Sequence, residues 1–212
     1  RGSCRSYQPT VVALLYTILI TAFWPALILI VAQLLKFVPG EVSFAHTISV
    51  GLSKAGLYFL TLEFFRQVCR NKGLADSHFG WPQEVRITLR TNLRWLMVST
   101  VPMVFAAATL YADVSSHSQD TLGLSIVQQS AARLFIMGTL VCAAVFVHRT
   151  LSTSKKVYRL LVGVLHEGEP QRWQQVLYVT VLVLIGALFL LALIGYDYTV
   201  ASLMLQLYES IL

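Results

Sequence analysis

Five stretches of about 20 largely apolar residues constrain the fold of this chain more than any other feature. They run over residues 11–35, 44–65, 93–112, 126–147 and 176–196, and a sixth begins at Tyr198. A helix rises about 1.5 Å per residue, so about 20 apolar residues cross the ~30 Å hydrocarbon core of a bilayer. Because only 12% of the residues are charged, an ordinary water-soluble domain is excluded. We predict an all-α integral membrane protein with five full spans and a sixth begun.

The basic residues gather in alternate segments between these spans, and this predicts the topology. Two basic residues precede the first span, Arg1 and Arg5. The second linker and its edges hold six, namely Arg66, Arg70, Lys72, Arg86, Arg90 and Arg94. The fourth linker and its edges hold five, namely Arg149, Lys155, Lys156, Arg159 and Arg172. The other linkers hold Lys36 alone. Since Lys and Arg are retained in cytoplasmic loops, we expect a cytoplasmic N-terminus. The net charge of +6 then reflects membrane topology, and no nucleic-acid partner is expected.

The alternation divides the chain into three antiparallel hairpins. Residues 1–72 hold the first hairpin and its cytoplasmic flank, residues 73–172 a basic amphipathic helix, the second hairpin and a basic linker, and residues 173–212 a truncated third hairpin. Since the last stretch stops early, we expect this chain to be part of a longer protein.

The segment from Trp81 to Trp95 predicts a basic amphipathic helix at the inner headgroup layer. Pro82 suits a first helical turn, and a spacing of four places its arginines on one face. The lipid headgroup contacts expected here are Trp81, Arg86, Arg90, Arg94 and Trp95, and a similar helix in the next inner linker adds Lys155, Lys156 and Arg159. Each arginine near anionic lipid contributes roughly 1 kcal/mol. The alternative is an ordinary positive flank of a membrane span.

Three residues inside the spans are unusual for lipid-embedded helices. A charge at membrane depth costs ~2.5–3.5 kcal/mol on insertion scales, so Lys54 invites a functional interpretation. One hypothesis pairs it with an acid such as Glu63 of a neighbouring hairpin or chain; the alternative is that Lys54 snorkels to the interface. Pro25 and Pro102 each remove a helix bond and are candidate kinks.

No catalytic, cofactor or metal site is visible in the sequence. The five histidines are dispersed, without an HExxH or Glu-x-x-His pattern, and no Walker A, GxGxxG or GxSxG motif occurs. Cys4, Cys69 and Cys142 are widely separated and form no CxxC pair. We therefore predict that the chain is not an enzyme and holds no cofactor.

Two segments carry a family resemblance. They are Phe64-Phe65-Arg66-Gln67-Val68-Cys69-Arg70 with the following Gly73 to Pro82, which ends in HFGWP, and the later Gly195-Tyr196-Asp197-Tyr198-Thr199. With them the chain resembles the large MscS-like mechanosensitive channels of Gram-negative inner membranes, of the potassium-dependent (KefA/MscK) type or its miniconductance relative. The resemblance covers the peripheral transmembrane helices alone. It implies a heptamer in the bacterial inner membrane whose pore helix and vestibule lie outside this chain.

The favoured interpretation is a lipid-embedded region that senses membrane tension for a channel involved in osmotic protection. Its expected partners are membrane lipids, anionic on the cytoplasmic leaflet, and further copies of the same protein. Two alternatives stay open at this point: a secondary transporter or transporter subunit, and a structural anchor for a periplasmic domain.

Overall fold

Five long helices account for nearly all of the described chain. The computed structural model describes residues 8–37, 43–70, 75, 81–116, 122–151, 170–194 and 206. The helices are α1 (Gln8–Lys36), α2 (Ser43–Val68), α4 (Gln83–Ser116), α5 (Leu122–Leu151) and α7 (Pro170–Ile194). No strand occurs among the described residues. The protein is all-α, as the apolar stretches predicted.

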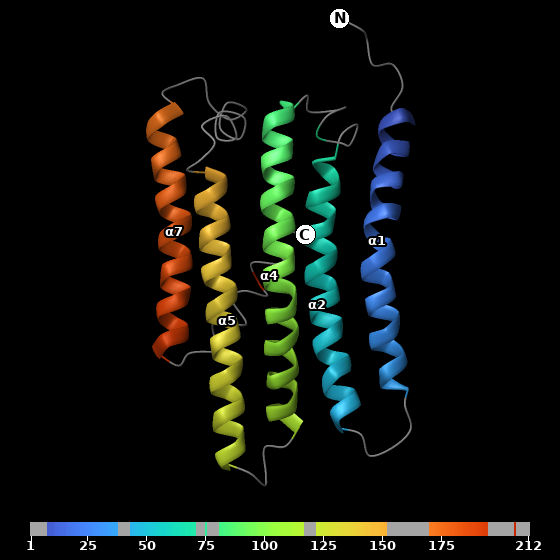
Figure 1. Ribbon diagram of the computed structural model, residues 1–212, viewed down its shortest axis with the longest axis vertical. Helices are drawn as coiled ribbons and strands as arrows, with labels where there is room; N and C mark the ends of the chain where they lie inside the picture. Colours follow the sequence, from blue (N-terminus) through green and yellow to red (C-terminus); the bar gives the residue numbers. More distant parts are fainter. Residues whose placement is uncertain are drawn as a thin grey trace, which may run out of the picture.

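The helices stand side by side in the order in which they follow one another along the chain (Figure 1). Their main contacts are between consecutive helices: α1 with α2, α2 with α4, α4 with α5, and α5 with α7. Each helix runs antiparallel to the one before it. Among the described helices the result is one row in a single layer rather than a closed bundle.

Four of these helices are long and apolar enough to cross a membrane. They contain the candidate spans Leu15–Lys36, Phe44–Val68, Gln83–Ala112 and Val127–Thr150. In α7 the apolar part, Tyr178–Ile194, is shorter than these four within the described residues. The expected sixth span, from Tyr198 onward, lies outside the described residues apart from residue 206.

The ends of α2 and α5 and the beginnings of α1, α4 and α7 lie at one end of the layer (Figure 1). We call this the basic end, because it carries Arg66, Arg70, Arg86, Arg90, Arg94 and Arg149. At this end α4 begins directly after Pro82, as predicted. The same helix then continues to Ser116 without a break. The expectation of a separate amphipathic helix lying on the headgroup layer is therefore wrong for this segment, which forms the first turns of a span.

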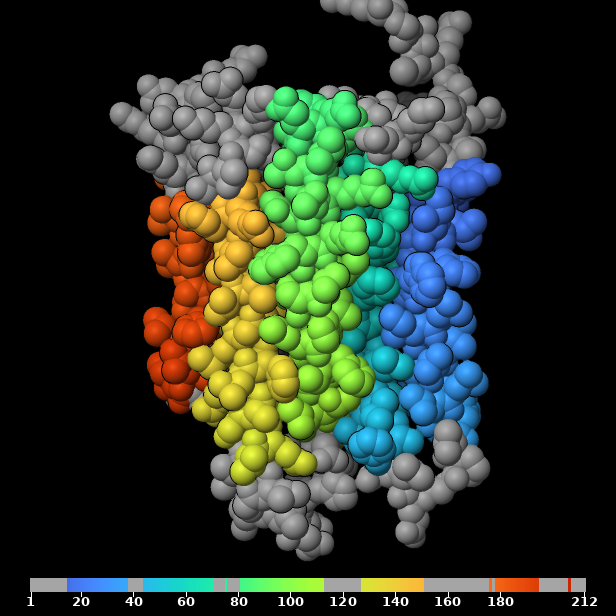
Figure 2. All heavy atoms as spheres, viewed as in Figure 1, coloured from blue at the N-terminus to red at the C-terminus, as the bar shows by residue number. Residues whose placement is uncertain are grey.

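The buried apolar core lies between α2, α4 and α5. Leu62, Leu93 and Leu96 form its buried centre, and Tyr58, Met97, Val101, Cys142 and Phe146 pack against it. Elsewhere the layer is open: only 17–28% of the most apolar window of each span is buried. Figure 2 shows α4 and α5 side by side on one broad face, with α1 and α7 at the two edges. Most of the apolar surface is therefore left for lipid or for other helices.

Candidate functional site

A recess of about 380 Å³ opens between α1 and α2 near the basic end. One wall is apolar and the other is polar. The apolar wall consists of Leu19, Ile20, Phe23 and Trp24 of α1, and the polar wall consists of Glu63, Arg66 and Gln67 of α2. The steps of one and four along α1 place its four side chains on one helix face. The recess therefore joins an aromatic and aliphatic surface to a charged group at the edge of a span.

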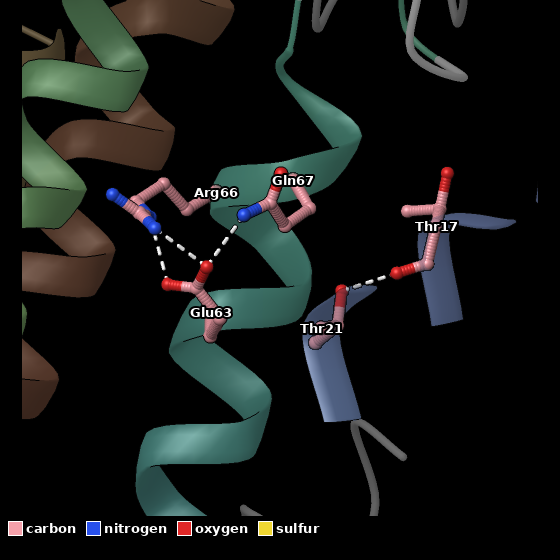
Figure 3. Close-up of polar contacts among 5 residues, drawn as sticks. All are labelled: Thr17, Thr21, Glu63, Arg66 and Gln67. Carbon is pink, nitrogen blue, oxygen red and sulfur yellow. Dashed lines mark hydrogen bonds and ion pairs between the residues drawn. The ribbon is translucent and has the colours of Figure 1, made fainter. Parts of the chain in front are cut away.

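The polar wall is a closed set of charge-assisted hydrogen bonds within the last turns of α2 (Figure 3). Arg66 donates from Nε to Glu63 Oε2 over 2.7 Å and from Nη2 to Oε1 over 2.6 Å. Gln67 Nε2 donates to the same Oε1 over 2.6 Å. The Glu63 side chain is only 4% exposed, so these donors take the place of water at both of its oxygens.

Arg66 is the member of this set that faces outward. Its side chain is 24% exposed, against 4% for its partner Glu63. The two bonds to Glu63 use Nε and Nη2, which leaves Nη1 outside this pair of bonds among the described residues. A guanidinium that is held in place by one carboxylate and still has free N–H groups can receive a second anionic oxygen. Sequence reasoning missed this cluster, although its spacing of three and four residues was the signal that could have found it.

The recess wall on α1 is strongly exposed. Phe23 and Trp24 are 60% and 64% exposed, and their rings meet edge to face with centroids 5.6 Å apart. On the other side of the same helix Thr21 is buried, and its hydroxyl donates to the Thr17 carbonyl over 2.6 Å (Figure 3). The hydroxyl is thereby satisfied within its own helix, so α1 presents only apolar groups to the recess.

Arg86 was expected to contact lipid headgroups, but it is buried in the structure. It is 7% exposed, and its Nε donates to the Trp81 carbonyl over 3.1 Å while Nη1 reaches the Arg70 carbonyl at 3.5 Å. These bonds join the end of α2 to the beginning of α4. The physical reason is helical phase: each step of four residues advances about 40° around the helix, so Arg86 and Arg94 point about 80° apart. Arg86 therefore falls on the packed side of α4.

The other members of the expected basic face lie at the surface. Arg90 and Arg94 are exposed, and Trp81 is half-buried. Trp95 is 38% exposed, and the guanidinium of Arg149 from α5 lies 5.8 Å from its ring centroid. Lipid contact by these residues stays a prediction. Lys155, Lys156 and Arg159 lie outside the described residues.

Beside Arg86, the thiol of Cys69 is buried at the end of α2. Burial raises the pKa of Cys69 above its ordinary value, because the thiolate would lose its hydration. The charges of Arg86 and Arg90 act in the opposite direction and offset part of this rise. The thiol therefore stays protonated at neutral pH and is a poor nucleophile.

The pairing of Lys54 with an acid such as Glu63 of a neighbouring hairpin or chain stays a hypothesis. Lys54 is exposed on α2, whereas Glu63 is buried and already bound by Arg66 and Gln67. Pro25 is buried within α1 and Pro102 is exposed within α4, and both helices continue past them. Their role as kinks stays a prediction. Within the described residues no three His, Cys, Asp or Glu side chains come together as a metal site would require.

Comparison with known proteins agrees with this membrane architecture. A family model described as mechanosensitive ion channel inner membrane domain 1 matches residues 2–212. The search of curated proteins finds no match, and neither does the search of solved structures. Because the family model covers almost the whole chain, which folds into long apolar helices with a basic end, this chain belongs to the mechanosensitive ion channel inner membrane domain family.

Proposed function

We propose that this domain is the lipid-embedded, tension-sensing part of a mechanosensitive channel that protects against osmotic shock, and that the pore lies outside residues 1–212. The single layer of helices carries this proposal. Between 72% and 83% of the most apolar window of each span is not buried within the chain, since only 17–28% is. Within the described residues, a layer of this kind offers both faces to its surroundings and encloses no path for ions.

The physical basis is the dependence of a membrane protein on the area and thickness of the bilayer around it. Tension favours whichever state occupies more area or matches a thinner bilayer. The edge helices α1 and α7, whose main contact is with one neighbour each, can tilt without exposing the core of α2, α4 and α5. The domain would thus convert stretching of the bilayer into helix tilt, which the rest of the channel transmits to its gate.

The recess between α1 and α2 gives this coupling a molecular contact. Its apolar wall fits an acyl chain, and the free donors of Arg66 fit the phosphate of a phospholipid headgroup. Arg90, Arg94 and Trp95 would add headgroup contacts on α4, and Lys155, Lys156 and Arg159 would do the same in the next linker. The basic end then lies on the cytoplasmic leaflet of the bacterial inner membrane, because Lys and Arg are retained there. In agreement with the resemblance, seven such domains would surround one pore.

Patch-clamp recording of the full channel in excised patches tests the proposal. The substitution Leu19→Trp should fill the recess and shift the tension threshold, because Leu19 lines the recess and is exposed. The matched control is Leu34→Trp, which makes the same change at an exposed site on α1 outside the recess. Deletion of residues 1–212 should shift the threshold further.

An unchanged threshold in both the Leu19→Trp channel and the deletion channel would reject tension sensing and leave an anchoring role. If only Leu19→Trp has no effect, the sensing role stands and the lipid contact in the recess is rejected. Equal effects of Leu19→Trp and Leu34→Trp would likewise reject the recess as the specific contact.

A further inference from the structure

One face of α2 carries a row of side chains that neither neighbouring helix covers. We call this row the open seam; it consists of His46, Val50, Lys54, Leu57, Thr61 and Phe65. Successive members are four, four, three, four and four residues apart, so they form one line along the helix. His46, Lys54, Leu57 and Phe65 are exposed, and Val50 and Thr61 are half-buried.

Contacts on the other faces of α2 show that the open seam lies away from both α1 and α4. On one side, a Cβ placed on Gly56 would lie 3.1 Å from Leu29 Cδ2 of α1. On another, a Cβ placed on Gly51 would lie 3.2 Å from the Phe105 carbonyl oxygen of α4. The backbones approach closely at these two glycines, so α1 and α4 occupy their sides of α2 and leave the seam uncovered.

The composition of the open seam does not suit a lipid-facing surface. Polar His46, Lys54 and Thr61 alternate with apolar Val50, Leu57 and Phe65. Along α1, by contrast, the large exposed residues include Leu15, Leu19, Phe23, Ile30 and Leu34, together with aromatic Tyr16 and Trp24. The span of α2 also has the lowest mean hydropathy of the four. Seams of regularly spaced apolar residues that include polar ones are typical of helix–helix contacts.

Lys54 gives the seam a specific electrostatic requirement. It lies about 16 Å from the Ser43 end of α2 and about 21 Å from the Val68 end, which is close to the middle of the span. Its ammonium group has no partner among the described residues. Glu63 is about 13 Å further along the same helix and is bound by Arg66 and Gln67. Glu84 lies in the first turn of α4, at the basic end. A charge at this depth is stabilised by a counter-charge.

We propose that the open seam docks a further transmembrane helix of the assembled channel, one that lies outside the described residues and carries an Asp or Glu opposite Lys54. The apolar members of the seam supply close packing, and the ion pair at mid-depth fixes the register of the two helices. This interface would join the domain to the rest of the channel. It does not depend on whether the domain senses tension.

Site-directed spin labelling of the full channel in liposomes tests the docking. Single cysteines replace Leu57 on the seam and Ile30 on α1 in a cysteine-free background, so that Lys54 itself stays intact. Collision rates of the attached nitroxide are measured with oxygen, which dissolves in lipid, and with a water-soluble nickel chelate. At position 57 both rates should be low, as at a protein contact, while position 30 should show high oxygen collision. A position 57 as accessible to oxygen as position 30, or accessible to the nickel chelate, would overturn the proposal.

Charge reversal tests the ion pair independently of any label. The substitution Lys54→Glu should abolish assembly of the full channel, measured on native gels, whereas Lys54→Arg should assemble. Lys36→Glu, at the opposite end of α1 from the basic end, is the matched control and should assemble. A second change of a membrane-embedded Asp or Glu to Lys outside the described residues should restore assembly of the Lys54→Glu channel. Normal assembly of Lys54→Glu would reject the pair.

Discussion

The centre and the edge of the helix layer are held together in different ways. In the centre, α2, α4 and α5 share the core around Leu62, Leu93 and Leu96 and the buried hydrogen bonds of Arg86. At the edge, α5 meets α7 through the smallest of the four main contacts, beside an apolar recess of about 180 Å³. A polar contact there is His148 Nδ1 with the Tyr178 hydroxyl at 2.8 Å.

Two glycines show the same difference. A Cβ on Gly51, in the centre, would overlap the Thr109 Cγ2 methyl group. A Cβ on Gly186, at the edge, would meet nothing within 4 Å. The centre is therefore packed to the limit, whereas the edge has free space. A layer built in this way has a rigid middle and a helix at its side that can shift at low cost.

The largest effect that separates centre from edge is expected for Gly51→Leu. The new side chain has no room between α2 and α4, and overpacking of this kind costs up to ~3 kcal/mol. The loss should be seen as a lower midpoint of unfolding in mixed micelles of increasing SDS content. The control Gly186→Leu should leave the midpoint unchanged. Equal losses in the two variants would contradict a tight centre and an open edge.

The next largest loss of stability is expected for Arg86→Met. The change removes the hydrogen bonds that the buried guanidinium donates to the Trp81 and Arg70 carbonyls, at a cost of about 1–3 kcal/mol. The same unfolding assay should show the loss, and hydrogen exchange should rise at the beginning of α4. Arg90→Met serves as the control, because Arg90 is exposed on the same helix. If Arg90→Met destabilises as much, burial of Arg86 is not the cause.

A smaller effect is expected at the edge for Tyr178→Phe. Loss of the single bond to His148, which lies at the surface, should cost about 0.5–1 kcal/mol. The substitution should increase local opening of α7 without lowering the unfolding midpoint of the remaining helices. Limited proteolysis between α5 and α7 can detect this local opening. Global unfolding at a lower SDS content would instead show that the edge is part of the cooperative centre.

The last expected effect concerns reactivity rather than stability. Burial raises the pKa of Cys69, so at any given pH a smaller fraction of it is thiolate than for a free thiol. Its maleimide labelling should be slow near neutral pH and should rise only at a pH above that of an exposed cysteine placed at Val176 on α7. Arg86→Met removes a charge that favours the thiolate and should move the Cys69 profile further upward. Identical profiles for positions 69 and 176 would show that the corner is open to solvent.

The helices themselves could be predicted from the sequence, because long apolar stretches leave a chain few other choices in lipid. The start of α4 after Pro82 followed from the local rules of helix capping. The basic segment predicts a helix separate from the following span, but α4 runs through both without a break. Nothing near Thr91 ends a helix, and the uninterrupted hydrogen bonds of a longer helix outweigh the gain from lying at the interface.

The site was harder to predict, since it depends on which helix covers which side chain. Periodicity groups Arg86 with Arg90 and Arg94, yet the angle of about 80° between Arg86 and Arg94 buries Arg86 only because α2 lies on its side of α4. One hypothesis pairs Lys54 with an acid such as Glu63 of a neighbouring hairpin or chain. Within its own chain Glu63 is bound by Arg66 and Gln67. The recess needs α1 and α2 side by side, and a sequence without a partner helix in place does not show it.

The ordering of helices in the layer also bears on how the domain is made. Its main contacts link each helix to the one synthesised just before it, so every new hairpin leaving the ribosome finds its docking surface already in the bilayer. A helix added to or removed from either margin, beside α1 or α7, would leave the core of α2, α4 and α5 intact. Such an architecture can gain helices at its margins during evolution, as repeat proteins gain repeats at their ends.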